Sequence, residues 1–222
     1  NDIVDKDFDK KVKRTKLRPI ASKKISVKRA LSYVLILCSL AFIVLIQFNF
    51  LTILLGLGSM FLAFAYPFMK RITYWPQLFL GITFNWGIIM AWTAYNGQIT
   101  SEILVLYLSA IFWTLGYDTI YGAQDMSDDE IIGLKSTSIK FKENIKLFIS
   151  LSYLISICLV IYLFYNFLGM NIFSFLLLSF ILSLIYQILK FEINKPDNYL
   201  SLFKLNNFSG LLLFLSIIFI NY

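Results

Sequence analysis

The chain has 222 residues, 59% of them hydrophobic, and its mean hydropathy is +0.74. A water-soluble domain usually contains about 45–50% apolar residues, so this composition excludes a single soluble core and favours a membrane protein. The sequence contains no His, which excludes a His-ligated metal, a His base and a Ser-His-Asp triad. Cys38 and Cys158 lie inside apolar runs and are expected to be lipid-buried side chains, not a disulfide or a metal pair.

Seven apolar stretches approach the length of about 20 residues that a helix needs to cross a hydrocarbon core. Backbone groups in lipid must be hydrogen-bonded internally, and the stretches lack barrel-like alternation, so each is predicted to be a helix. The predicted fold class is therefore all-α, a polytopic transmembrane helical bundle. The expected spans are Ala30–Phe48, Phe50–Phe68, Trp75–Tyr95, Glu102–Tyr117, Ile145–Phe167, Ile172–Phe191 and a short Phe208–Tyr222.

Basic residues distinguish the two sides of this bundle. Residues 1–29 hold 11 of the 20 Lys and Arg residues, and the others follow the second, fourth and sixth expected spans. The intervening loops Gln47–Thr52, Asn96–Ser101 and Asn166–Asn171 hold none. The positive-inside rule therefore predicts that all basic loops face the cytoplasm, or the matrix in a mitochondrion. The net charge of +7 is a topology signal, and no nucleic-acid partner is expected because no soluble domain presents the basic loops.

Two acidic segments lie on this basic side, and both have helical spacing. In the first, Asp2, Asp5 and Asp9 are spaced i, i+3 and i+7. The second follows the fourth expected span, with positions spaced i, i+3, i+7 and i+11. Each row is therefore predicted to occupy one face of a helix. The members of the second row are Asp118, Tyr121, Asp125 and Asp129.

The acidic rows favour a metal-bound diphosphate. Residues 117–130 contain five acids and no base, and neighbouring carboxylates disfavour each other's ionised form. A divalent cation removes that cost, and oxygen ligands without His favour Mg²⁺ or another hard cation that bridges to substrate phosphates. One acidic run at a membrane surface is usually a solvated loop, but two helix-spaced runs on the same side favour a site. Asp7, Asp128 and Glu130 lie off the shared faces and are expected to be solvated.

The two rows resemble the two signatures of the UbiA family of intramembrane prenyltransferases. They read Asn1-Asp2-x-x-Asp5-x-x-x-Asp9 and Asp118-x-x-Tyr121-Gly122-x-x-Asp125-x-x-x-Asp129. The family usually has Ala at the position of Gly122, which is a small-for-small change. Further matches are Val12-Lys13-Arg14-Thr15-x-x-Arg18-Pro19 and Gly133-x-Lys135-Ser136-Thr137, so that the resemblance covers essentially the whole chain.

The resemblance implies nine transmembrane helices around a central cavity, with the first signature after the second helix. The seven expected spans that follow the signature agree with nine minus two. Residues 1–222 are therefore expected to form a single UbiA-like membrane domain that lacks the first two helices.

The loop after the second span discriminates between branches of the family. It reads Tyr66-Pro67-x-x-Lys70-Arg71-x-Thr73-x-x-Pro76-Gln77 and is similar to the pattern of 4-hydroxybenzoate polyprenyltransferases. The implied reaction is Mg²⁺-dependent transfer of a polyprenyl group from polyprenyl diphosphate to the ring of 4-hydroxybenzoate, in ubiquinone biosynthesis. Two alternatives stay open: another UbiA-type acceptor (haem, menaquinone or lipid), and a membrane transporter. A transporter would favour charges within the spans near the midplane, whereas these acids cluster at one interface.

The resemblance also implies roles for individual residues. Mg²⁺ and cationic side chains would stabilise the leaving diphosphate while the ring attacks the allylic cation. The general base is not assigned. The expected catalytic residues are Asp2, Asp5, Asp9, Asp118, Asp125 and Asp129, and the expected Mg²⁺ ligands are Asp2, Asp5, Asp9, Asp125 and Asp129. The expected substrate-binding residues are Asn1, Arg14, Arg18, Tyr66, Lys70, Arg71, Tyr121 and Lys135.

The expected partners are the two substrates and membrane lipid, and protein partners are left unassigned. The Lys, Ile, Asn and Phe content is typical of low-GC coding and favours a bacterium. The expected location is the bacterial inner membrane with the active site facing the cytoplasm, and the mitochondrial inner membrane is the alternative.

Overall fold

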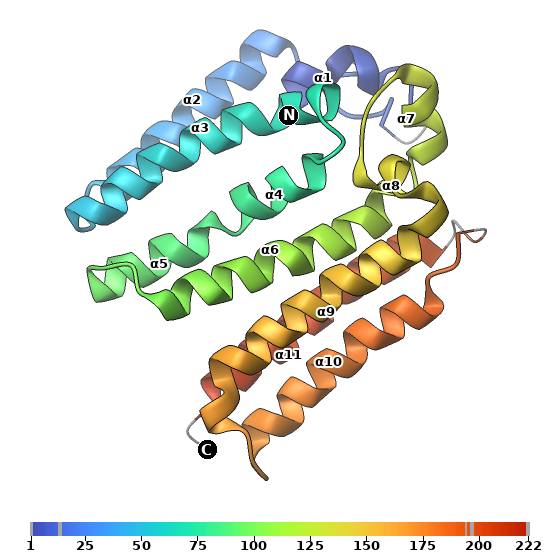
Figure 1. The fold of residues 1–222 in the computed structure, drawn as a ribbon. Helices are drawn as coiled ribbons and strands as arrows, with labels where there is room; N and C mark the ends of the chain where they lie inside the picture. Colours follow the sequence, from blue (N-terminus) through green and yellow to red (C-terminus); the bar gives the residue numbers. More distant parts are fainter. Residues whose placement is uncertain (1, 13–14, 194, 196–197, 221–222) are drawn as a thin grey trace.

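The computed structural model describes residues 2–12, 15–193, 195 and 198–220. These residues form helices and connecting turns without a β-strand (Figure 1). Seven helical segments are long and apolar enough to cross a membrane, which confirms the predicted all-α bundle. The membrane-length helices are α2 (Val27–Leu45), α3 (Phe50–Ile72), α4 and α5 (Pro76–Phe84 and Trp86–Asn96, together one span), α6 (Ser101–Gly122), α9 (Ile145–Phe164), α10 (Ile172–Lys190) and α11 (Tyr199–Ile218). The short helices are α1 (Asp2–Asp9), α7 (Met126–Ile132), α8 (Thr137–Lys140) and the 3₁₀ turns η1 (Lys142–Asn144) and η2 (Tyr165–Phe167).

The third span is interrupted, which the sequence analysis did not predict. Helix α4 ends at Phe84 and α5 begins at Trp86, with Asn85 between them. The amide nitrogen of Asn85 donates to the carbonyl of Gly81 at 2.8 Å and to Thr114 Oγ1 of α6 at 2.8 Å. Asn competes with the helix for backbone partners, and here its side chain ties the break to the neighbouring helix.

The last span begins earlier than the expected Phe208–Tyr222. Helix α11 starts at Tyr199, so that Lys204, which was assigned to a loop, lies within the helix. The polar residues of this first half had interrupted the apolar run in the sequence. One of them, Asn206, accepts a hydrogen bond from Trp113 Nε1 at 2.9 Å inside the bundle. Hydropathy alone missed this half of the helix because it does not register such partners.

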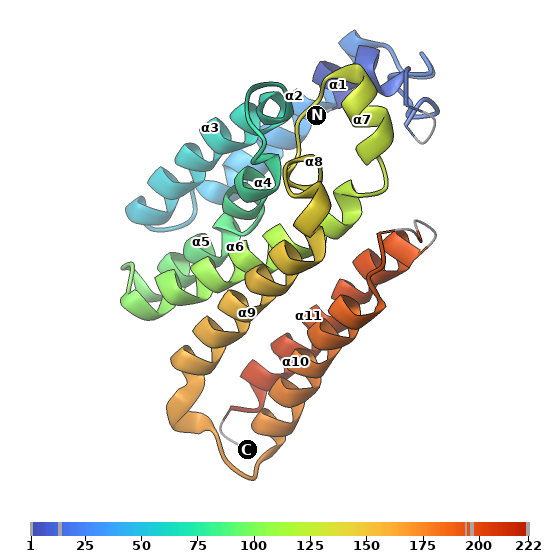
Figure 2. The same ribbon diagram turned by 45° about the vertical axis from the view of Figure 1, so that its right-hand side comes forward.

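Helix α6 is the central helix of the bundle and contacts α4, α5, α8, α9 and α11. Gly116 allows α9 to approach closely, because a Cβ at that position would overlap the ring of Tyr153. The α2–α3 pair lies on one side of the layer that contains α4, α5 and α6, and the α10–α11 pair lies on the other side (Figure 2). Cys38 and Cys158 are free thiols, as expected.

A polar network fixes the packing of the helices that surround α6. Tyr153 donates to Gln187 Oε1 at 2.7 Å, and Asn206 Nδ2 donates to the same oxygen at 3.1 Å. Ser183 donates to Ser209 at 2.8 Å across the α10–α11 pair. Unpaired amides in an apolar setting cost several kcal/mol, so these bonds favour a single arrangement of α9, α10 and α11.

The short helices α1, α7 and α8 gather at one end of the bundle (Figures 1 and 2). The same end contains the start of α2, the ends of α3 and α6 and the start of α4, whereas α11 ends at the opposite end. The fold therefore brings the two acidic segments of the sequence to one end of a helical bundle.

Candidate functional site

Helix α1 carries the first acidic row, as its spacing predicted. Asp5 is fully buried, Asp9 is 4% exposed, and Asp2 is partly buried on the same helix. Asp7 lies off this face and is exposed, with Lys10 Nζ 2.7 Å from its carboxylate. The hydrogen bond from Lys10 lowers the pKa of the Asp7 carboxyl below its ordinary value. The predicted division between a row on one helical face and a solvated acid is therefore confirmed for α1.

Two cations at the end of α3 neutralise the buried carboxylate of Asp5. Lys70 Nζ lies 2.7 Å from Oδ2, and Arg71 Nη2 lies 3.2 Å from Oδ1. Arg71 Nη2 also donates to the carbonyl of Val4 at 2.9 Å, and its guanidinium lies 4.8 Å from the centre of the Phe8 ring. Because a buried charge is costly unless it is paired, this cluster fixes α1 against α3.

Arg18 joins the other two acids of α1. Its Nη1 atom lies 3.2 Å from Asp2 Oδ1 and 3.2 Å from Asp9 Oδ2. Thr15 holds the same turn, since its hydroxyl donates to the backbone carbonyl of Asp9 at 3.1 Å. Arg18, Lys70 and Arg71, which were predicted to bind substrate, are therefore all paired with the first acidic row.

The second acidic row does not lie on one continuous helix, so the predicted helical face over residues 118–129 is wrong. Helix α6 ends at Gly122, and α7 starts at Met126 with Asp125 immediately before it. Short polar side chains such as Asp and Ser favour helix starts, and residues 125–129 contain four of them. Gly133 ends α7 with φ of 80°, a left-handed conformation that favours glycine.

The turn between α6 and α7 nevertheless keeps the second row together. A cavity of about 150 Å³ lies at this end of the bundle. Its polar lining comes from α3, α4, α6, α7 and the segment before α8, and it includes four residues that were predicted to bind substrate. The lining residues are Tyr66, Pro67, Lys70, Pro76, Gln77, Asp118, Tyr121, Gly122, Asp125, Asp129, Lys135 and Ser136.

A second cavity, of about 100 Å³, is lined partly by α1 and the residues that follow it. Lys70, Asp125 and Asp129 line both cavities, so these three residues stand at the boundary between them. Asp9 and Arg18 line the second cavity only. The two acidic rows thus meet around Lys70, although they are far apart in the sequence.

The metal-ligand prediction has no direct test in this geometry. Within the part of the chain that the structure describes, no three acidic side chains lie close enough to hold one metal ion together. Asn1 and Arg14, two of the predicted substrate-binding residues, lie outside the described residues. The donor set that lines the cavities consists of carboxylate oxygens, which suits a hard cation. The Mg²⁺ ligand set therefore stays a prediction.

Lys135 lines the larger cavity and also fastens its own loop to α3. Its backbone nitrogen donates to the carbonyl of Lys70 at 2.8 Å. Its Nζ donates to the carbonyl of Ile72 at 3.1 Å and lies 5.5 Å from the centre of the Tyr74 ring. Lysine commonly binds the unpaired carbonyls at a helix C-terminus, so Lys135 has a structural role besides its position at the cavity.

The sequence analysis assigned no role to a buried polar clamp beneath this cavity, although two of its members, Gln77 and Thr137, stood in the matched motifs. Gln77 Oε1 accepts a hydrogen bond from the backbone nitrogen of Thr137 at 3.0 Å. The hydroxyls of Thr137 and Thr119 lie 2.7 Å apart, and Ser138 donates to the carbonyl of Thr119 at 2.8 Å. All four side chains are at most 5% exposed. The clamp joins α4, α6 and α8, and thereby sets the shape of the cavity wall.

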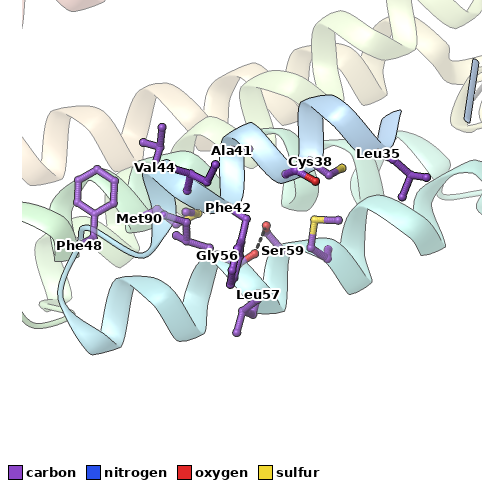
Figure 3. A pocket seen from close by; sticks show the side chains of 14 residues that line it. Leu35, Cys38, Ala41, Phe42, Val44, Phe48, Gly56, Leu57, Ser59 and Met90 are labelled. Carbon is purple, nitrogen blue, oxygen red and sulfur yellow. Dashed lines mark hydrogen bonds between the residues drawn. The ribbon is translucent and has the colours of Figure 1, made fainter. Parts of the chain in front are cut away.

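A third cavity is an apolar groove of about 820 Å³ between α2 and α3, with Met90 of α5 at its side (Figure 3). Ser59 donates to the carbonyl of Gly56 at 2.6 Å along its α3 wall. Among the described residues, none that lines this groove also lines an acidic cavity. The groove is therefore separate from the acidic site.

The fold and the site together define a polytopic membrane protein with two acidic segments at one end of its bundle. The model of the UbiA prenyltransferase family matches residues 1–217, and the chain belongs to this family. Among curated relatives, it is 50% identical over 151 residues to the 4-hydroxybenzoate polyprenyltransferase, mitochondrial, of Drosophila melanogaster, covering 68% of this chain and 38% of that protein. It is 42% identical over 227 residues to the protein of the same name from Bos taurus, covering 98% of this chain and 59% of the relative. The chain thus spans 38% and 59% of the lengths of these two relatives.

Two solved structures share the fold. The apo structure of a UbiA homolog from Aeropyrum pernix K1 matches with a TM-score of 0.82 at 23% identity, over 98% of this chain and 81% of that one. A structure described as digeranylgeranylglyceryl phosphate synthase matches with a TM-score of 0.68 at 17% identity, over 99% of this chain and 78% of that one. At these identities the similarity establishes a common helical architecture.

Proposed function

We propose that the protein transfers a polyprenyl group from polyprenyl diphosphate to the aromatic ring of 4-hydroxybenzoate, with Mg²⁺ as cofactor. The observation that carries this proposal is the meeting of both acidic rows around Lys70, where Lys70, Asp125 and Asp129 line two adjacent cavities. The choice of acceptor is supported by relatives named 4-hydroxybenzoate polyprenyltransferase at 42–50% identity.

The diphosphate end of the donor fits the boundary between the cavities. Asp125 and Asp129, with the α1 acids, would hold Mg²⁺, which neutralises diphosphate charge and makes it a better leaving group. Lys70 and Arg18 are near enough to the acids to bind phosphate oxygens in place of carboxylates. These groups stabilise the charge that develops on the diphosphate as the allylic C–O bond breaks.

The aromatic acceptor fits the larger of the two acidic cavities. Tyr66 and Tyr121 line it, and aromatic faces stabilise a nearby cation such as the allylic carbocation. Tyr121 is itself supported by Phe203 of α11, with ring centres 4.5 Å apart. The acceptor ring attacks the cation, a C–C bond forms ortho to the hydroxyl, and loss of the ring proton restores aromaticity.

The acids of the two rows that line the cavities lie on α1, on or just before α7, and near the end of α6, and not midway along the spans. Transport through a bundle favours ionisable residues near the midplane, so this distribution supports catalysis at the membrane surface. We place this end of the bundle at the cytoplasmic side of a bacterial inner membrane, or at the matrix side of the mitochondrial one, because the basic loops share it.

The test uses membranes that contain the complete protein, supplied with labelled 4-hydroxybenzoate, a polyprenyl diphosphate and Mg²⁺. Labelled, lipid-extractable product is expected, and its absence with intact protein would reject the proposed reaction. Asp125→Ala combined with Asp5→Ala should abolish product. The matched control is Asp7→Asn, an exposed acid of α1 that lies off the row and should leave activity unchanged. Product that survives the double substitution would reject the site.

A further inference from the structure

Gln77 presents an unused hydrogen-bond donor at the larger acidic cavity. Its side chain is 5% exposed and lines the cavity. Because the backbone nitrogen of Thr137 can only donate, the amide oxygen of Gln77 must be the atom that faces it, at 3.0 Å. Among the described residues, Nε2 of Gln77 donates no hydrogen bond. The orientation of this amide is therefore fixed by α8, and its donor is left for another partner.

Gly122 provides the space beside that donor. A Cβ at Gly122 would lie 3.0 Å from Gln77 Nε2 and 2.8 Å from Ser138 Oγ, so a side chain there forces one of these groups to move. The cavity that both residues line has a volume of about 150 Å³. Cavities of about this size bind a single benzene ring. The wall formed by Gln77 and Gly122 thus closes a space of the right size for one aromatic ring.

We propose that Gln77 selects the aromatic acceptor, with its Nε2 donating a hydrogen bond to the acceptor carboxylate in the cavity that Gly122 also lines. The inference rests on the proposed function, because it names a residue that recognises the acceptor of that reaction. Lys70 and Lys135 line the same cavity and offset part of the charge of its three acids, Asp118, Asp125 and Asp129.

The chemistry of the ring sets its orientation. A donor at the phenol oxygen would withdraw electron density from the ring and slow its attack on the carbocation. An acceptor for the phenol proton does the opposite, and Asp118 lies one helical turn before Gly122, about 6 Å along the axis of α6. The carboxylate therefore faces Gln77 and the hydroxyl faces Asp118.

The first test is Gln77→Glu, which keeps an oxygen for the Thr137 nitrogen but replaces the donor with a second oxygen. Loss of a hydrogen bond to a charged group lowers kcat/KM for 4-hydroxybenzoate by about tenfold to a hundredfold. The KM for polyprenyl diphosphate is unchanged. 4-Hydroxybenzyl alcohol, which lacks the carboxylate, is measured as a competitor of 4-hydroxybenzoate, and its inhibition constant changes less than about threefold.

The control is Ser138→Ala, which removes another bond of the same buried clamp and does not line the cavity. This variant keeps the wild-type carboxylate preference, which is the kcat/KM for 4-hydroxybenzoate compared with the inhibition constant of 4-hydroxybenzyl alcohol.

Wild-type carboxylate preference in Gln77→Glu overturns the inference. If Gln77→Glu does not accumulate in membranes, Gln77→Met, which also lacks the donor but adds no charge, decides by the same measurement. A wild-type protein that prenylates no aromatic carboxylate rejects the proposed function itself. If the wild-type protein does prenylate an aromatic carboxylate and the Gln77 variant keeps the wild-type preference, only the role of Gln77 is rejected.

Discussion

The ion-pair cluster around Asp5 is expected to hold α1 in place, and Asp5→Asn tests this. Asp5 is fully buried, and its partners Lys70 and Arg71 have side chains that are 27% and 31% exposed. Removing one partner of a buried ion pair costs about 3–5 kcal/mol. We expect the low end, about 3 kcal/mol, because the two cations left behind are accessible enough to be hydrated. A free energy of that size corresponds to about a hundredfold change in an equilibrium constant.

The assay is native-state hydrogen exchange of the α1 amides in the complete protein, in lipid nanodiscs. Local opening of α1 should become about a hundredfold more frequent in Asp5→Asn, while exchange in α6 and α9 stays unchanged. The matched control is Asp7→Asn on the same helix, whose side chain is 67% exposed and pairs with Lys10. An exposed pair of this kind contributes about 1 kcal/mol at most. Equal exchange in the two variants would show that the buried cluster does not hold α1.

Three further predictions concern α7, the polar network and the metal. Gly133→Ala should lower the thermal unfolding temperature, because a left-handed conformation costs an ordinary residue about 1–2 kcal/mol, and Gly133→Asn should lower it less. Asn206→Leu should destabilise the bundle by about 2–3 kcal/mol in a denaturation series, because it leaves Trp113 Nε1 without its partner, and a wild-type midpoint would contradict this. Chelation with EDTA should abolish prenyl transfer and added Mg²⁺ should restore it, and full activity after exhaustive chelation would reject the cofactor.

The sequence was sufficient for features that depend on residues close together in the chain. A membrane span needs an apolar run of nearly fixed length, so six of the expected spans correspond closely to helical segments of the structure. The row Asp2, Asp5 and Asp9 was predicted correctly because helical periodicity alone decides which residues share a face. The family resemblance also pointed to Lys70 and Arg71, although the sequence placed them in a loop and the structure places them in the last turn of α3.

Only the tertiary structure decided how distant segments meet. It showed that the chain turns between Gly122 and Asp125, so that the second row lines a cavity instead of one helix face. It also placed Asn206 inside α11, where Trp113 of α6 donates a hydrogen bond to its side chain. In the sequence, this polar residue had lowered the hydropathy of the segment and so argued against a membrane span. In the sequence, Gly122 at a position where the family usually has Ala looked like a minor change. The structure shows that a Cβ there would lie within 3.0 Å of side-chain atoms of Gln77 and Ser138. Periodicity describes the faces of one helix, but hydrogen-bond partners and free space depend on which other helices pack against it.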